Sequence, residues 1–277
     1  MVEAGERCSH FMRRRKLALC TLSCYAIYRA ILVVYRALAQ RLIKAQSYVE
    51  HAVYINLPNR LDRRSQVEYE LRRAHIAFER IEGVKVRKFD PEAAACWDDG
   101  DAQCLGQLGC QRSHLKALKW AESHRWKEIA IFEDDFTWLP NVDPAYAHHV
   151  LEKIRGHLKD WDVIALGLRL LKTEELDPKV IVSIGPQVKA RVVRIVSAAT
   201  THAYVVNGAY ITQLYNAFSA CNVTKNYDTA IDTCWFELQK SGKWYGIKPQ
   251  MGTQRKGFSD IEHKYIDLEA FISTNEG

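Results

Sequence analysis

The sequence predicts an α/β domain with an open, mostly parallel sheet flanked by helices. From residue 51 onward, short apolar runs alternate with amphipathic stretches, which is the pattern of such a domain. One of these runs, residues 129–132, is continuously apolar, as strands buried on both faces are. The composition agrees, because 277 residues that are 48% apolar and 26% charged suffice for a buried core and exclude collagen-like, disordered and disulfide-scaffold classes.

The net charge of +6 comes from the first fifty residues. They hold nine of the 39 Lys and Arg but only three of the 33 Asp and Glu, so the rest of the chain is balanced. A nucleic-acid-binding surface needs an excess of basic side chains to neutralise phosphates. We therefore expect no nucleic-acid partner for the body of the protein.

The basic N-terminus divides the chain into residues 1–45 and a domain over 46–277. Residues 17–35 are mostly apolar with one charge, Arg29, and about 20 apolar residues span a membrane. An N-terminal apolar helix is expected here, as a signal anchor or a membrane-associated helix. Five Lys and Arg precede it and three follow, which favours a single-pass type II arrangement in the endoplasmic reticulum or Golgi. A helix packed on the body, or a nuclear localisation run, would instead leave the protein cytoplasmic.

The first β-loop-α unit begins with a strand at 52–57, which Pro58 and Asn59 end. Asp62 is expected to cap the following helix. The helix has apolar residues at i, i+4 and i+7, namely Val67, Leu71 and Ala74. Residues 76–81 form the next expected strand.

The middle of the chain continues the alternation after an irregular insertion at 82–105. Gly106 to Gly109 open a helix that runs to about Ser123, and the strand 129–132 follows. Further strands are expected at 163–166, 180–184, 192–196 and 203–206, and helices at 208–220 and 229–239.

The chain has eight cysteines and no C-x-x-C pair, so neither a zinc ribbon nor a thioredoxin-type site is supported. Five of them lie in the body, and an odd number cannot all pair within one chain. Buried free thiols are the expectation, with a loop disulfide among Cys96, Cys104 and Cys110 as the alternative.

Glu133, Asp134 and Asp135 directly follow the strand 129–132. Three adjacent carboxylates are costly unless a positive charge satisfies them, and oxygen ligands suit Mg²⁺ or Mn²⁺. Alternation along an extended run places Glu133 and Asp135 on one side and Asp134 on the other. Ligands of open α/β sheets bind beyond the carboxyl ends of the strands, where this run would lie. The alternative is a solvated acidic turn that caps a helix near 141–144.

Several motifs together resemble glycosyltransferase family 25, which includes lipooligosaccharide and collagen galactosyltransferases. They are, in order, Val53-Tyr54-Ile55-Asn56-Leu57 with Arg60 and Asp62-Arg63, then Gly109-Cys110-Gln111-Arg112-Ser113-His114-Leu115, then Phe132-Glu133-Asp134-Asp135. A weaker match continues through 203–206 to 254–262, so the resemblance covers nearly the whole body.

The resemblance implies a GT-A-like sheet and an inverting enzyme that uses a nucleotide sugar. The expected reaction transfers a hexose, galactose or glucose, from a UDP-sugar to a glycan or protein-linked acceptor, with Mn²⁺ or Mg²⁺ as cofactor. Asp135 is the first expected metal ligand and Glu133 the second, while Asp134 would meet the donor ribose. Asn56 and Arg60 would meet the base, ribose or phosphates. Arg63 would bind the donor or pair with a helix carboxylate.

Three further residues are candidates for the donor or metal site. His114 lies on the apolar side of its helix, which fits a structural histidine, whereas the family motif places it beside the donor. Near the C-terminus, Arg255 would reach the diphosphate and Asp260 would supply a metal or acceptor contact. The alternative for 254–262 is a solvated tail.

An inverting transfer needs a base that takes the proton from the acceptor hydroxyl. Asp228 matches the family by position, although it follows Asn226-Tyr227 where the family has Pro-Val or Pro-Ile. Its alternative role is a helix N-cap. Asp232, four residues later, is the second candidate base.

Two other functions compete with the transferase. A metal-dependent nucleotidyl or phosphoryl transferase would also use clustered carboxylates, but no G-x-x-x-x-G-K-[ST] loop is present to hold a triphosphate. A non-catalytic module would bind a nucleotide sugar or glycan without consuming it.

Overall fold

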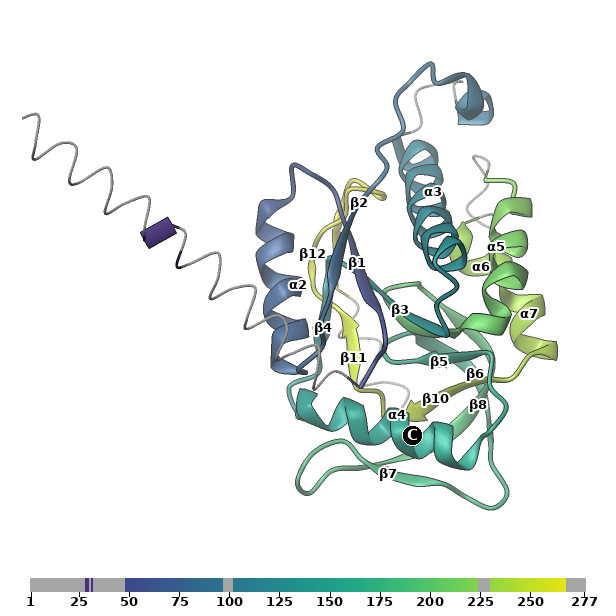
Figure 1. The fold of residues 1–277 in the computed structure, drawn as a ribbon. Coiled ribbons are helices and arrows are strands. Elements are labelled where there is room, and N and C mark those ends of the chain that lie inside the picture. Colours follow the sequence, from purple (N-terminus) through teal and green to yellow (C-terminus); the bar gives the residue numbers. More distant parts are fainter. Residues whose placement is uncertain (1–27, 30, 32–47, 97–101, 224–229, 268–277) are drawn as a thin grey trace, which may run out of the picture. The chain divides into compact units, whose positions relative to one another are not determined.

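The expected alternation of strands and helices is present in a computed structural model of the chain (Figure 1). It describes residues 28, 29, 31, 48–96, 102–223 and 230–267. Ser47–Gly277 forms one unit by its own contacts. The apolar helix expected at 17–35 lies outside the described residues except for Tyr28, Arg29 and Ile31. Among the residues that are described, no helix has both the length and the apolar character to cross a membrane.

A nine-stranded sheet forms the centre of this unit, in the order β2-β1-β3-β9-β5-β10-β8-β6, with β7 beside β8. The strands are β1 (Ala52–Asn56), β2 (Glu79–Glu82), β3 (Glu128–Glu133), β5 (Val163–Ala165), β6 (Arg169–Glu175), β7 (Ile181–Ser183), β8 (Lys189–Ala199), β9 (Ala203–Asn207) and β10 (Trp244–Lys248). β1 pairs in parallel with β2 and β3, and β5 with β10. The sheet is mostly parallel as expected, but β8 and β9 run against the others.

Helices cover both faces of the sheet (Figure 1). α2 (Leu61–Arg73) and α4 (Ala147–His157) pack on one face, and α3 (Ala102–Ser123), α5 (Ile211–Ala220), α6 (Ile231–Cys234) and α7 (Phe236–Ser241) on the other. Successive residues of β3 alternate between the two cores, because side chains of a strand alternate between faces. The strand is fully buried from Ile129 to Phe132, as its continuous apolar run predicted.

Short elements complete the chain. They are the 3₁₀ turns η1 (Pro91–Cys96), η3 (Pro144–Tyr146) and η4 (Gly208–Tyr210) and the strands β4 (Phe136–Trp138), β11 (Gly252–Gln254), β12 (Gly257–Phe258) and β13 (Tyr265–Ile266). β4 follows the acidic run directly and pairs with β11, which brings the C-terminal segment against the end of β3. The sequence did not predict this pairing, because both strands are three residues long.

Helix α2 forms for the predicted reason but begins differently. Val67, Leu71 and Ala74 are completely buried, so the apolar stripe does face the sheet. The expected N-cap, Asp62, is wrong. The N-cap residue is Arg60, which makes no capping side-chain bond, and Asp62 instead accepts hydrogen bonds from the Arg60 guanidinium at 2.9 and 3.0 Å.

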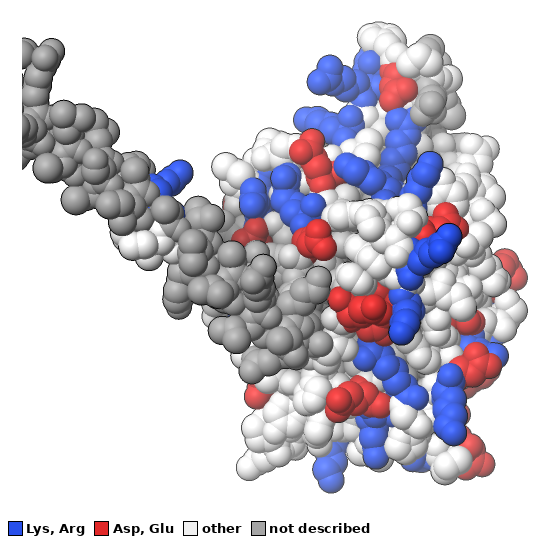
Figure 2. All heavy atoms as spheres, in the orientation of Figure 1, with Lys and Arg blue, Asp and Glu red and all other residues white. Residues whose placement is uncertain are grey.

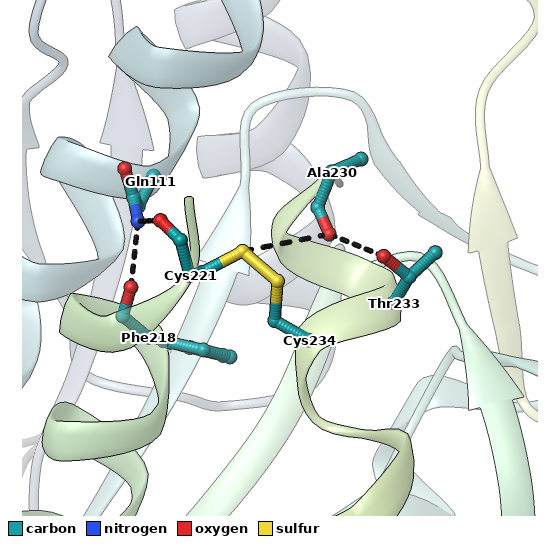
Figure 3. Close-up of a disulfide and its surroundings, with 6 residues drawn as sticks. All are labelled: Gln111, Phe218, Cys221, Ala230, Thr233 and Cys234. Atoms are coloured by element: carbon teal, nitrogen blue, oxygen red, sulfur yellow. Dashed lines mark hydrogen bonds between the residues drawn. A yellow bond between two sulfur atoms is a disulfide. The ribbon is translucent and has the colours of Figure 1, made fainter. Parts of the chain in front are cut away.

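Two disulfides correct the expectation of free thiols, and the first confirms the alternative of a loop disulfide among Cys96, Cys104 and Cys110. Cys96 pairs with Cys104, and Cys221 pairs with Cys234, which leaves Cys110 as a free cysteine among the described residues. Cys221–Cys234 joins the end of α5 to α6 (Figure 3). Gln111 of α3 donates to the carbonyl oxygens of Phe218 and Cys221 at 2.6 and 2.7 Å, so α3 also holds the end of α5.

Replacing Cys221 and Cys234 together with Ser is expected to lower the free energy of unfolding by about 3 kcal/mol, because the cross-link closes a short loop in the unfolded chain. Denaturant titration measures this loss. Peptide mapping without reductant should recover a linked pair containing both cysteines. Alkylation of all five body cysteines in denatured, unreduced protein would contradict the pairing.

Candidate active site

A cavity of about 320 Å³ lies beyond the carboxyl ends of β1 and β3. Ile55 and Asn56 of β1 line it, together with Glu133 of β3 and with Gly83 and Val84 after β2. This is the crevice in which open α/β sheets bind ligands. A cavity therefore lies where the sequence predicted the ligand-binding site, beyond the carboxyl ends of the strands.

Two glycines of α3 let the chain close around this cavity. A Cβ atom at Gly109 would lie 2.6 Å from the carbonyl oxygen of Val84, and one at Gly106 would lie 2.8 Å from the Cα atom of Ile261. Both distances are too short for a side chain. Glycine at these positions therefore lets α3 approach the segment after β2 and the C-terminal segment.

Asp134 and Asp135 occupy a buried turn after β3, with 8% and 5% of their surface exposed. Arg63 Nη1 donates to both carboxylates at 3.0 Å. Asn56 donates to Asp134 and Gln254 to Asp135, each at 2.8 Å. The alternative of a solvated acidic turn is therefore wrong. Arg63 pairs with the acids at the strand end and not with a carboxylate of its own helix.

Glu133 has different partners, on the α3 side of the sheet. Its Oε1 atom accepts a hydrogen bond from the Thr201 hydroxyl and lies 3.2 Å from His114 Nε2. His114 Nδ1 lies 2.8 Å from the hydroxyl of Tyr204, so protein groups engage both nitrogens of this buried ring. This arrangement supports the structural role for His114, in which the ring holds Glu133 in place.

The predicted alternation, with Glu133 and Asp135 on one side and Asp134 on the other, is wrong for their hydrogen-bond partners, although all three carboxylates line the first cavity. Asp134 and Asp135 share Arg63, whereas Glu133 contacts His114 and Thr201. The physical reason is that β3 ends at Glu133 and the chain turns at the next two residues. The two-residue alternation of an extended strand does not continue through a turn.

Burial and mutual repulsion set the ionisation of these acids. Burial, together with the charge of Glu133, raises the pKa of Asp135 to about 7. Burial also raises the pKa of Asp134. Burial acts to raise the pKa of Glu133 too, but hydrogen bonds from His114 and Thr201 outweigh it and lower that pKa to about 2. The hydrogen bonds therefore favour the ionised form of Glu133, while burial favours the protonated form of Asp135.

Glu133, Asp134 and Asp135, here called the acid cluster, present carboxylates of the kind that hold a divalent cation to the first cavity. Arg63 is the one described lysine or arginine that forms a salt bridge with the cluster, so full ionisation leaves two negative charges uncompensated. The Oδ1 atom of Asp135 is buried without a hydrogen-bond partner among the described residues. Carboxylate oxygens are the ligands that Mg²⁺ and Mn²⁺ prefer.

A second possible ligand set fits less well. Ligand atoms of Cys110, His114 and Glu133 lie within 4.8 Å of one another. Burial raises the pKa of the Cys110 thiol well above its ordinary value, and the thiolate is the form that binds metal. Both nitrogens of His114 are already engaged. By their chemistry the carboxylates are the better candidate ligands, whereas the ligand atoms that already lie close together are those of Cys110, His114 and Glu133.

Three candidates from the sequence are engaged in ion pairs. Arg60 pairs with Asp62 and with Asp260, so Asp260 lines the cavity with its carboxylate already occupied. Arg255 Nη2 donates to Glu70 at 2.8 Å. The guanidinium groups of Arg60 and Arg255 do not line the cavity that the described residues form. In this structure carboxylates hold both guanidinium groups, Asp62 and Asp260 that of Arg60 and the buried Glu70 that of Arg255. The expected donor contacts of both arginines, and the metal or acceptor contact of Asp260, stay predictions.

Asp232 lines a second cavity, of about 220 Å³, which also borders Glu133. Its Oδ2 atom accepts the backbone N–H of Thr200 at 2.9 Å, and burial raises its pKa. Thr200 has a φ of 63°, a strained conformation for a β-branched residue. The other candidate base, Asp228, lies outside the described residues.

The sequence model described as "Glycosyltransferase family 25 (LPS biosynthesis protein)" matches residues 50–235. The match spans more than half of the chain and includes β1, α3 and the acid cluster. The chain belongs to glycosyltransferase family 25. Membership in this family implies a nucleotide-sugar donor and a glycan acceptor. No curated protein sequence matches the chain.

This family 25 chain is similar to several solved structures at low identity and with TM-scores below 0.5. A glycosyltransferase involved in the glycosylation of the major capsid of PBCV-1 is 11% identical, with a TM-score of 0.42 over 81% of this chain and 98% of the other. UDP-glucose pyrophosphorylase in complex with UDP-glucose is 10% identical, with a TM-score of 0.38 over 85% and 84%. A197 from STIV is 10% identical, with a TM-score of 0.33 over 78% and 93%.

Sequence reasoning missed two residues that line the cavities of this family 25 chain, Lys85 and His202, and it also missed Glu70, which holds Arg255. Glu70 lies between Val67 and Leu71 on the apolar stripe of α2, and a carboxylate in such a stripe is a readable signal of a buried partner. Lys85 lines the first cavity from the 82–105 insertion, whose path the sequence does not reveal. His202 lines the second cavity just before β9.

Proposed function

We propose that this family 25 protein transfers a hexose, galactose or glucose, from a UDP-sugar to a hydroxyl of a glycan or protein-linked acceptor, with inversion and with Mn²⁺ or Mg²⁺. Family membership supports sugar transfer. The observation that supports the metal ion and the diphosphate leaving group is the acid cluster. It lies at the carboxyl end of a central strand, Asp134 and Asp135 are buried, and its negative charge exceeds what Arg63 balances.

The first cavity suits a nucleoside diphosphate. Ile55, Leu57 and Val86 give it an apolar wall that can accept the face of a base. Arg63 and Lys85 line it as well and can pair with phosphate oxygens. A bound Mn²⁺ or Mg²⁺ would be held by Asp135 and Glu133 and would offset negative charge on the leaving diphosphate.

In the proposed reaction the acceptor oxygen forms a bond to the anomeric carbon of the donor sugar. The bond between that carbon and the diphosphate oxygen breaks on the opposite face, and its electron pair leaves with UDP. The hydroxyl proton passes to a carboxylate, which we assign to Asp232, with Asp228 as the alternative. Burial raises the pKa of Asp232, and a higher pKa makes a carboxylate a stronger base.

We further propose that the body resides in an oxidising compartment, with residues 17–35 as its membrane anchor. The two disulfides support the compartment, because such bonds persist in secretory lumens and not in the cytosol. Carbonate extraction of the full-length protein tests the anchor. Release into the soluble fraction would contradict it.

Product analysis tests the reaction class. Purified full-length protein is incubated with UDP-galactose, UDP-glucose and Mn²⁺, and nucleotide products are separated. Released UDP is the expected result. UMP or pyrophosphate would point instead to nucleotidyl or phosphoryl transfer, and binding without release would point to a non-catalytic module.

The affinity for Mn²⁺ is expected to rise with pH up to about 7 and then level off, because the metal competes with the proton on Asp135, whose pKa is about 7. Below that pH the carboxyl is mostly protonated and each unit costs up to about tenfold in affinity. Calorimetric titration of Mn²⁺ from pH 5.5 to 8.5 measures the slope. An affinity independent of pH over this range would contradict metal binding by Asp135.

A further inference from the structure

The second cavity meets the first at the acid cluster. Five described residues line both cavities, namely Cys110, Glu133, Gln254, Ser259 and Ile261. A ligand in the second cavity is therefore adjacent to a donor in the first. Asp232, the assigned base, lines only the second cavity. An acceptor placed there would have its hydroxyl between the donor and the base, as transfer requires.

His202 is a polar side chain without a partner at the wall of this second cavity. The residue is only 3% exposed, and neither ring nitrogen has a hydrogen-bond partner among the described residues. Buried polar atoms of native proteins almost always have a partner, so a ligand hydroxyl is the natural one here. An imidazole with one N–H and one free lone pair can both donate to and accept from hydroxyl groups. The Phe136 ring lies beside it, with ring centroids 6.5 Å apart.

The charges around the second cavity select against an anionic acceptor. Glu133 and Asp232 contribute carboxylates, and Arg169 is the one described arginine or lysine that lines the cavity. The third carboxylate, Glu262, is paired with Lys264 at 2.6 Å. Ile231, Ile261 and Ile266 add apolar surface of the kind that packs against the face of a sugar ring.

We propose that the second cavity binds the acceptor, that the acceptor group there is a neutral sugar, and that His202 is a positioning residue which hydrogen-bonds one of its hydroxyls. This inference rests on the proposed transferase function. His202 aligns the acceptor, so that another hydroxyl of the same sugar attacks the anomeric carbon and loses its proton to Asp232. The donor in the first cavity does not depend on His202.

Binding of a simple neutral glycoside tests the proposal without knowledge of the natural acceptor. The probe is methyl β-D-galactopyranoside, and methyl β-D-glucuronide is its anionic counterpart. Binding to the full-length protein is measured by saturation-transfer NMR with and without UDP, and the affinity for UDP is measured by calorimetry. The variants are His202→Phe, which keeps a ring without polar atoms, and His202→Gln, which restores a donor and an acceptor. The exposed His157→Phe is the matched control.

His202→Phe is expected to weaken binding of the neutral glycoside by about tenfold or more, as expected when hydrogen bonds at a polar site are lost. His202→Gln should recover part of it, His157→Phe should match the wild type, and UDP affinity should stay within about twofold throughout. The proposal is overturned if the wild type binds no neutral glycoside, if His202→Phe binds it normally, if the glucuronide binds more tightly, or if UDP affinity falls together with glycoside affinity. A wild type that binds the glycoside but not UDP would instead contradict the proposed UDP-sugar donor. Failure of the acceptor proposal and failure of the proposed function are therefore distinguishable.

Discussion

Asp135→Asn is expected to lower sugar transfer by at least about 10²-fold while making the metal-free protein more stable. The loss of activity follows because a metal ion stabilises transition-state charge by several kcal/mol and this ligand would be gone. The gain in stability follows from the pKa of Asp135, which folding raises from 3.8 to about 7. The folded state therefore binds this proton more tightly than the unfolded chain, so stability falls as pH rises from about 4 to about 7.

The amide removes this penalty because it carries no charge at any pH. We expect the melting temperature of metal-free Asp135→Asn at pH 8 to exceed that of the wild type by a few degrees, on the order of 1 kcal/mol. Added Mn²⁺ should stabilise the wild type but not the variant. Asp143→Asn is the matched control, because Asn also caps a turn and Asp143 caps η3 away from the site. A variant that transfers sugar normally, or is still stabilised by Mn²⁺, would contradict the assignment of Asp135.

Asp232→Asn is expected to lower kcat by about 10²- to 10⁴-fold, the usual contribution of a general base. The amide is nearly isosteric and its oxygen can still accept the Thr200 N–H, so the fold and the donor cavity should persist. UDP affinity is therefore expected to remain within about twofold of the wild type. Single-turnover kinetics with a saturating UDP-sugar separates the chemical step from binding.

Asp228→Asn is the comparison for this variant, because Asp228 is the candidate that matches the family by position. Loss of turnover in Asp228→Asn with normal turnover in Asp232→Asn would move the base to Asp228. Normal turnover in both Asp228→Asn and Asp232→Asn would show that neither carboxylate is the general base. If Asp228 is instead a helix N-cap, Asp228→Asn should change the free energy of unfolding while kcat is retained.

Local sequence patterns predicted the elements that position the site. The apolar run 129–132 gave β3, the spacing of Val67 and Leu71 gave the buried face of α2, and the break after 52–57 marked the end of β1. The expectation that ligands bind beyond the carboxyl ends of parallel strands then placed the cavity correctly. These inferences succeeded because each depends on periodicity within one segment.

Contacts between distant segments were not predictable in the same way. Arg255 pairs with Glu70, 185 positions away, and Asp260 pairs with Arg60, 200 positions away. No local pattern shows which carboxylate an arginine will meet after folding. The same holds for Cys221 and Cys234, whose pairing depends on how α5 and α6 pack.

The prediction that Glu133 and Asp135 face the same side was wrong for a local reason. The alternation rule was extended past the end of the strand into a turn, where it does not hold. His202 was missed because its significance comes from an absence of partners, which only the folded structure reveals.

Anomalous diffraction from crystals grown with UDP and Mn²⁺ tests the central claim most directly, since the manganese signal locates the cation without reference to activity. The account predicts one peak bonded to Asp135, with Glu133 beside it and the UDP diphosphate as a further ligand in the first cavity. UDP bound elsewhere, or bound in that cavity with no manganese at these carboxylates, would contradict it.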